Sequence, residues 1–151
     1  MANRKPLVLI NGQLAQLPDG DVLLGTVSEV DVTEMQAKEA VSAGMAVYCS
    51  AGFQVLKAVN DTAAKAEVMG LAKADAALDA YTKVQAEGFF ELADWTAVIG
   101  SATLTPGTEY FLDATAGLLT STPPATGYSV LVGRAVKPTM LQLKIGTPIA
   151  L

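Results

Sequence analysis

Acidic side chains that recur at short spacings are the residues of this sequence whose types could do chemistry. Two neighbouring carboxylates can act as general acid and general base when their surroundings separate their pKa values. No spacing in this chain requires such a site, and Asp and Glu are mostly solvent-exposed in proteins, so we expect solvated turns and strand faces. The groups in question are Asp19 and Asp21; Glu29, Asp31 and Glu34; Asp75 and Asp79; and Glu87, Glu91 and Asp94.

Other kinds of catalytic or binding chemistry have even less support in the sequence. The chain has no His and a single Cys, which removes the commonest general base and any multi-thiolate zinc site. Cys49 lies in an apolar, alternating run with Val47 and Tyr48, so we expect a buried, inert thiol. The turn from Asp19 to Asp21 lacks the further oxygen ligands of a calcium loop. We therefore expect no catalytic, metal-binding or cofactor-binding residues, and we do not expect an enzyme.

Composition limits the classes of protein to which the chain can belong. Its 151 residues allow one domain, or two small ones that share a core. Charged residues make up 17%, below the usual quarter or so, which fits either a surface covered by partners or a weakly charged soluble domain. The net charge of −5, without a basic cluster, argues against binding to nucleic acid. No apolar stretch is long enough to cross a bilayer, and the first residues lack a signal-peptide pattern, so we expect synthesis in a cytoplasm.

A faint internal repeat is the main organising feature of the sequence. Gly44 and Gly107 each precede a short apolar run and a turn, and Gly70 and Gly133 each lie in an apolar run that ends in Ala. Both glycine pairs are 63 positions apart. A fixed period of this kind predicts two similar structural units, at about 44–95 and 107–151.

Frequent turns between short apolar segments predict a mostly β protein, a compact barrel or sandwich. In the alanine-rich segment 60–80, helix propensity competes with the repeat, which places a strand at 68–72 and leaves at most one helical turn at 60–66. From Thr33 the pattern leaves two alternatives open: a short helix with Thr33 as N-cap and Gln36 in the capping box, or a strand at 38–41. Further strands are expected at 82–85, 88–92, 110–113, 117–119, 128–136 and 139–145.

The first 25 residues are expected to form an extended N-terminal arm, and residues 26–151 a β-rich domain. Leu7 to Ile10 read as a strand, and Asn11-Gly12 and the segment 17–21 read as turns. The apolar residues of this arm are the candidates for contacts with a partner: Leu7, Val8, Leu9, Ile10 and Leu14. The single Trp95 is expected to anchor the core or a junction, with ligand stacking as the alternative.

Several of these strand-and-turn segments resemble small virion proteins of tailed bacteriophages. The segments 38–48, 52–58 and 68–72 resemble strings in head decoration (cement) and head-fibre proteins. The segments 104–112, 117–120 and 123–124 resemble a sequence pattern that is widespread in phage fibre and capsid-accessory proteins. The segment 14–21 resembles the N-terminal segments of phage fibres. No catalytic residue is carried over with this resemblance, which covers roughly residues 14–145.

The resemblance implies a β-rich structural protein of the virion, often trimeric, bound to the outer capsid surface. Its expected partners are the major capsid protein and further copies of itself, with a trimer favoured and with neither nucleic acid nor membrane. The alternative is a tail-fibre or baseplate module that binds host carbohydrate through Trp95, Tyr81 and Tyr110. A long repetitive shaft is missing, which favours the compact capsid-surface protein. A hydrolase is the third and weakest hypothesis.

Overall fold

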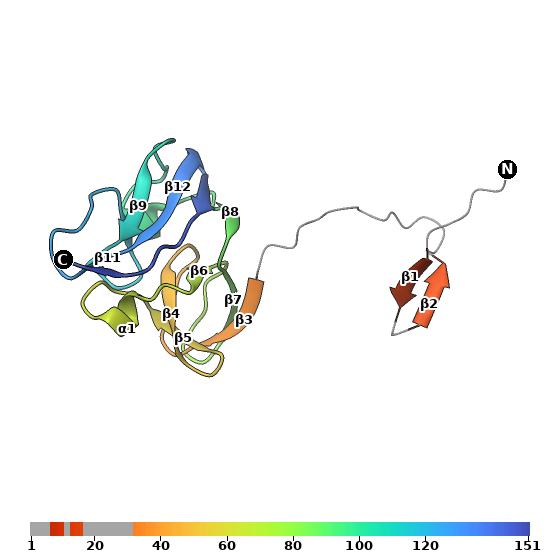
Figure 1. The fold of residues 1–151 in the computed structure, drawn as a ribbon. Coiled ribbons are helices and arrows are strands. Elements are labelled where there is room, and N and C mark those ends of the chain that lie inside the picture. Colours follow the sequence, from red (N-terminus) through yellow and green to blue (C-terminus); the bar gives the residue numbers. More distant parts are fainter. Residues whose placement is uncertain (1–6, 11–12, 17–31) are drawn as a thin grey trace.

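The computed structural model describes residues 7–10, 13–16 and 32–151, and in this part the chain is mostly β, as predicted (Figure 1). Its elements, in chain order, are β1 (Leu7–Ile10), β2 (Gln13–Gln16), β3 (Val32–Ala37), β4 (Ala46–Ala51), β5 (Gln54–Lys57), α1 (Ala63–Ala66), β6 (Gly70–Ala72), β7 (Tyr81–Gln85), β8 (Gly88–Glu91), α2 (Thr96–Ile99), β9 (Glu109–Leu112), β10 (Leu119–Thr120), β11 (Tyr128–Ser129), β12 (Leu131–Lys137), β13 (Met140–Leu143) and β14 (Ile149–Ala150).

A closed five-stranded barrel forms the first unit, with the strand order β3-β5-β4-β6-β7. All neighbours are antiparallel except β3 and β5, which run parallel and complete the ring with the β3–β7 pair. Alternating positions on these strands fill the interior, because successive side chains of a strand point to opposite faces. The buried residues of this inner core are Met35, Ala37, Val41, Val47, Val55, Ala72, Ala76 and Val84.

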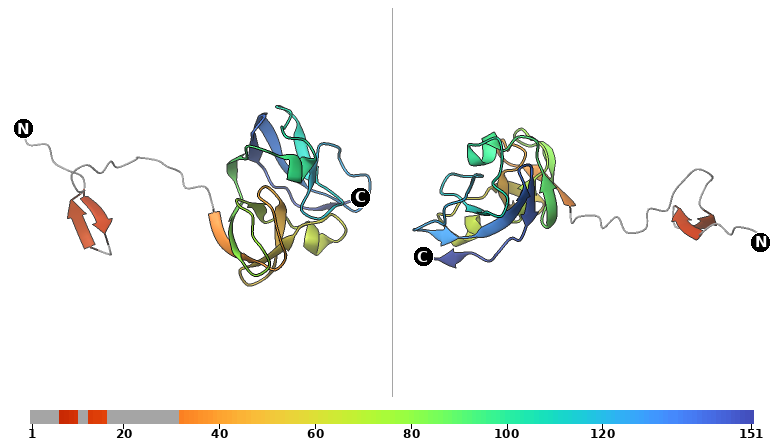
Figure 2. Two further views of the ribbon diagram at one scale, coloured as in Figure 1. Left: turned by 180° about the vertical axis from the view of Figure 1, so that it is seen from behind. Right: turned by 90° about the horizontal axis from the view of Figure 1, so that it is seen from above.

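An open five-stranded antiparallel sheet forms the second unit, with the strand order β10-β9-β12-β13-β8. Figure 1 shows this sheet, in green (β8) to blue, against the barrel, in orange to green, and the views of Figure 2 show the same two units from behind and from above. A small separate ribbon pairs β11 with β14 next to the C-terminus. The shared apolar core between barrel and sheet draws Ala46 and Leu71 from the barrel and Phe90, Leu112 and Val132 from the sheet.

The two units have the same strand order. The strands of each unit can be numbered one to five in chain order, which gives β3, β4, β5, β6 and β7 in the barrel and β8, β9, β10, β12 and β13 in the sheet. In both units, neighbouring strands then follow the order 3-2-4-5-1. The matching strands span residues 32–85 and 88–143, so each unit begins with a strand that precedes the glycine of the sequence repeat.

Backbone hydrogen bonds repeat at the same spacing of 63 residues. Gly44 N–H donates to Ala72 O at 2.8 Å, and Gly107 N–H donates to Ala135 O at 2.7 Å. Ala72 N–H and Ala135 N–H donate in turn to residues 45 and 108, at 3.0 and 2.9 Å. Gly44 and Gly107 have φ angles of 87° and 85°, a region that favours glycine. The repeat of the sequence is therefore a repeat of backbone geometry.

The units differ in how the tip of one hairpin is used. In the barrel, Phe53 O at the β4–β5 tip accepts from Gln36 N–H of β3 at 2.8 Å, which begins the closing parallel pair. In the sheet, Gly117 at the β9–β10 tip is engaged by the barrel instead: its O accepts from Ala46 N–H and its N–H donates to Ala58 O. The hairpin tip that closes the barrel in the first unit therefore has a counterpart in the second unit that binds the barrel. The sheet stays open, with β8 and β10 unpaired with each other.

Two of the sequence alternatives are decided by the structure. The helix with Thr33 as N-cap is wrong, because residues 32–37 form β3, whose inward residues Met35 and Ala37 are buried. The alternative strand at 38–41 is also misplaced, since only Val41 there makes an isolated bridge, with Ala76. In the alanine-rich segment, the strand is confirmed as β6 and the single helical turn as α1. Packing against β4 and β7 overrides helix propensity there.

The expected strand at Leu7–Ile10 is confirmed as β1, which pairs antiparallel with β2 and places Leu9 opposite Leu14. The predicted turns at 11–12 and 17–21, and the carboxylates Asp19, Asp21, Glu29 and Asp31, lie outside the described residues.

The short helix α2, which the sequence did not predict, follows an acidic side chain that holds its first turn. Asp94 Oδ1 accepts from Thr96 N–H at 2.9 Å and from Thr96 Oγ1 at 2.5 Å. The side-chain hydrogen bond from Thr96, followed by the backbone one, lowers the pKa of Asp94, because both favour the ionised carboxylate.

We expect the stabilising effect of Asp94 to depend on pH. The folded state has the lower pKa, so this stabilisation is complete above the unfolded value near ~4 and is lost as the pH falls through the folded value. Asp94→Asn should therefore lower the melting temperature at pH 7, and the gap to the wild type should close in acid. Glu87→Gln is the matched control for loss of one exposed carboxylate. A gap that stays constant with pH would contradict this account.

Candidate functional site

The described acidic residues do not assemble into a reaction centre. Glu34, Asp75, Asp79, Glu87, Glu91 and Asp94 are all exposed, as expected. Within residues 32–151 and the two arm strands, no group of three or more His, Cys, Asp or Glu side chains is placed to hold a metal ion. Ser50 is exposed in the β4–β5 hairpin, where its Oγ donates to Gln54 O at 3.4 Å.

The prediction of a buried Cys49 is wrong, because this thiol is exposed. β6 is short and pairs with β4 only at Ala46 and Val47. Beyond Val47 the β4–β5 hairpin therefore projects past the wall of the barrel, and the apolar pattern of the sequence continues into solvent. The Cys49 Sγ donates to Ala51 O at 3.0 Å.

Trp95 is a junction anchor, as expected. Its side chain is completely buried in the core shared by barrel and sheet, edge-on to Phe90 with ring centres 5.8 Å apart. Its indole N–H donates to Thr139 O at 3.2 Å. Tyr110 is also buried, and its hydroxyl accepts from Thr105 N–H at 3.0 Å. Of the three aromatic residues predicted for carbohydrate binding, only Tyr81 is exposed.

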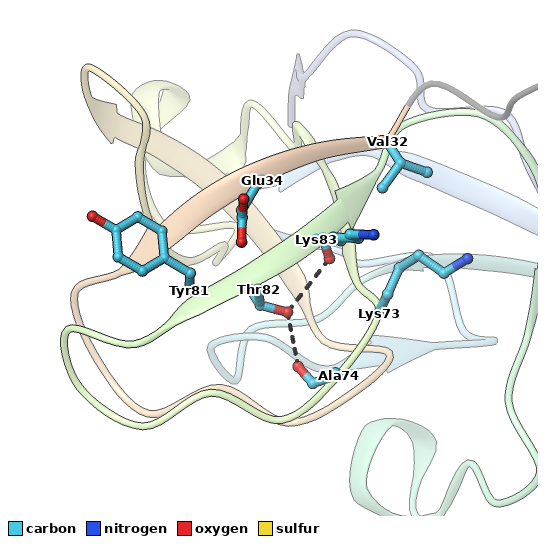
Figure 3. A pocket seen from close by; sticks show the side chains of 7 residues that line it. All are labelled: Val32, Glu34, Lys73, Ala74, Tyr81, Thr82 and Lys83. Atoms are coloured by element: carbon cyan, nitrogen blue, oxygen red, sulfur yellow. Dashed lines mark hydrogen bonds between the residues drawn. The ribbon is translucent and has the colours of Figure 1, made fainter.

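The outer face of β3 and β7 is the most distinctive surface of the described chain. A groove of about 750 Å³ lies along it, lined among others by Glu34, Tyr81 and Lys83 of the two strands and by Lys73 directly after β6 (Figure 3). Thr82 and Ala74 also line the groove, and the Thr82 hydroxyl donates to Ala74 O at 3.0 Å. This hydrogen bond ties β7 to the segment after β6 and holds the groove floor.

Three cross-strand pairs make up this surface, which we call the β3–β7 face. The antiparallel register sets Glu34 opposite Lys83 and Gln36 opposite Tyr81. The third pair is Lys38 and Asp79, whose side chains form an ion pair. Gln36 Nε2 also donates to Asp79 O at 3.2 Å. The face thus has a polar-aromatic centre with one acid and one base at each end.

Phe53 stands beside this face in an unfavourable backbone conformation. Its φ is 54°, and its side chain is 70% exposed. A left-handed conformation costs a bulky non-glycine residue about 1–2 kcal/mol. The equivalent tip of the second unit carries Gly117, with a φ of 82°. Glycine would adopt this conformation without that cost, so the backbone conformation does not require an aromatic side chain at residue 53.

Two further large side chains are exposed at the same end of the barrel. Leu78 is 62% exposed and Tyr81 is 64% exposed. Asp79, between them, is the other described non-glycine residue with a positive φ, and its N–H donates to Ala37 O at 2.7 Å. The sequence suggests other roles for Tyr81, Asp79 and Gln36, and it gives no signal for Phe53 and Lys38. Their nearness follows from strand pairing across the ring, which has no local signal in the sequence.

The fold defines the class of the protein: a mostly β chain in which a closed barrel and an open sheet have the same strand order. No protein-family model matches the chain, and a comparison with curated protein sequences finds no match either. In the part of the chain that the structure describes, no helix is long and apolar enough to cross a membrane.

Proposed function

We propose that the protein is a structural component of a tailed-phage virion that binds the outer capsid surface and stabilises it. The observation that carries the proposal is where the virion-like segments fall. The segments 38–48, 52–58 and 68–72 include the first half of β4, all of β5 and all of β6, and 104–112 and 117–120 include β9 and β10. The resemblance therefore follows the repeated scaffold itself rather than scattered surface positions.

The proposed mechanism uses the N-terminal arm as the docking element. The arm strand β1 consists of Leu7, Val8, Leu9 and Ile10, and Leu14 lies in its partner strand β2. Apolar area removed from water contributes about 25 cal/mol per Å², so even a small contact with the major capsid protein becomes useful when it is repeated over a shell. Copies that associate with one another would add avidity.

The test is binding to capsids that lack the protein. A chain without residues 1–16 is expected to lose capsid binding, while circular dichroism and the thermal transition of residues 32–151 stay unchanged. Leu9→Asp should have the same effect as the deletion, because it places a charge in the apolar arm. Gln13→Asp, on the paired strand of the arm, is the matched control and should bind like the wild type. Capsid binding by the truncated chain would sink this mechanism.

A further inference from the structure

The β3–β7 face has a charge pattern that is complementary to itself. Val32 lies at the start of the outward side of β3. Next come Glu34 and Gln36 on the strand and Lys38 just after it, an acid, a neutral residue and a base. Opposite them across the strand pair stand Lys83, Tyr81 and Asp79, in the reverse order of charge. The four charged residues, Glu34, Lys38, Asp79 and Lys83, lie at the corners of a rectangle. Neighbouring corners carry opposite charges, and diagonally opposite corners carry the same charge.

Two copies of such a rectangle fit face to face about a two-fold axis. If the axis runs parallel to the strands, Glu34 of one copy faces Lys83 of the other, and Lys38 faces Asp79. If it runs across the strands, Glu34 faces Lys38, and Lys83 faces Asp79. Both arrangements bring only opposite charges together, and both place the Gln36–Tyr81 row of one copy on that of the other. A contact of this kind is isologous, since the same patch serves both subunits.

The centre and edge of the face supply the apolar part of an interface. Phe53, Leu78 and Tyr81 are each more than half exposed, and together they present roughly 400 Å² of mostly apolar surface, given the ~150–250 Å² of an aromatic side chain. A standard interface buries ~800 Å² per partner, so these side chains would supply about half of it, and the groove walls and the charged corners the rest. An aromatic centre inside a charged rim is the usual anatomy of a protein interface.

A second copy also fits the overall charge of the chain. Each copy carries a net charge of −5, so two copies repel each other over most orientations. The β3–β7 face carries two acids and two bases, and Lys73 adds a further base in the groove, so the contact itself lacks the net negative charge of the chain.

We propose that the β3–β7 face, with Phe53 at its edge, is a two-fold interface between two copies of this chain. Phe53 keeps its strained backbone because its side chain is buried in the pair. The inference goes beyond capsid decoration and does not depend on it, since the arm and the face are separate. A two-fold contact closes at two copies, so it is also distinct from the trimer that the resemblance to phage proteins implies.

Sedimentation equilibrium of the full chain over roughly 5–500 µM tests the pairing, a range suited to a weak dimer. We expect a monomer–dimer equilibrium. Phe53→Gly should weaken dimerisation at least tenfold and leave the melting temperature of the monomer, measured under dilute conditions, unchanged or higher, because glycine relieves the positive φ. Ile149→Ala is the matched control: Ile149 is 64% exposed on β14, which pairs with β11 outside the barrel, and its loss should leave dimerisation unchanged.

Charge reversal tests the pattern and finds the axis. Glu34→Lys sets like charges against each other in both arrangements, so it should abolish dimerisation although the chain becomes less acidic. Glu67→Lys makes the same change of net charge at an exposed position outside the face, and it should pair at least as well as the wild type. Adding Lys38→Glu to Glu34→Lys restores pairing only for an axis across the strands, and adding Lys83→Glu restores it only for an axis along them.

The outcomes separate cleanly. A dimer lost in Phe53→Gly and Glu34→Lys, and regained in one of the two double variants, supports the interface. A chain that stays monomeric at all concentrations overturns it, as does a dimer or trimer indifferent to both single variants. Capsid binding by a Phe53→Gly monomer would leave the docking arm standing, so the two proposals fail independently.

Discussion

Gly133→Ala is expected to lower the free energy of unfolding by about 3 kcal/mol, at the upper end of the usual cost of overpacking. A β-carbon at residue 133 would come within 2.4 Å of Gln142 O and 3.0 Å of Leu141 Cγ. The nearer atom belongs to the backbone of β13, so it cannot move aside without breaking the β12–β13 ladder. Gly70→Ala should be equally damaging, since its β-carbon would lie 2.3 Å from Gln85 O of β7. Urea denaturation of each variant measures the loss.

Gly52→Ala is the matched control for these two variants. No atom lies within 4 Å of a β-carbon at residue 52, and this glycine does not have a positive φ. We expect its stability to change by less than about 1 kcal/mol, with a gain possible because alanine restricts the unfolded chain. If the three alanine variants unfolded at the same urea concentration, close strand approach at Gly70 and Gly133 would not be the reason for glycine there.

Trp95→Ala is expected to cost about 3–5 kcal/mol, as large-to-small changes of buried aromatic residues do. The change empties the largest fully buried side-chain site, removes the edge-on contact with Phe90 and leaves Thr139 O without its indole donor. Because Trp95 joins barrel and sheet, we expect both to unfold together at a lower temperature, as followed by far-UV circular dichroism.

Trp95→Phe separates the parts of this effect. Phenylalanine keeps a ring against Phe90 but cannot donate to Thr139 O, so we expect a smaller loss of roughly 1–3 kcal/mol. A Trp95→Ala variant as stable as the wild type would contradict the assignment of Trp95 as the junction anchor.

Local patterns were sufficient to predict the fold class and the positions of most strands. Glycines 44 and 107, at a constant spacing from 70 and 133, marked the backbone positions where only glycine fits, and these recur in both units. The same spacing identified β6 against the helix propensity of an alanine-rich segment. These predictions rest on limits at the glycines themselves: a positive φ at 44 and 107, and close approach of a neighbouring strand at 70 and 133.

Features that depend on pairing over long distances in the sequence could not be predicted. Nothing near Val32 indicates that β3 pairs with β7 about fifty residues later, so the β3–β7 face had no signature. The prediction of a buried Cys49 is wrong because the short β6 ends before it, so β4 has only β5 as a neighbour at residue 49. The strain at Phe53 is invisible in the sequence, where a Gly-Phe pair reads as an ordinary turn.

β6 and the first two residues of β4 are buried on both faces, and this limits how the molecule can come apart. Val47 and Ala72 lie in the barrel interior, while their neighbours Ala46 and Leu71 belong to the core shared with the open sheet. Opening the sheet would expose one side of both strands, and opening the barrel would remove the support of the sheet. We therefore expect residues 32–151 to unfold as one cooperative unit and to resist stepwise proteolysis while they are folded.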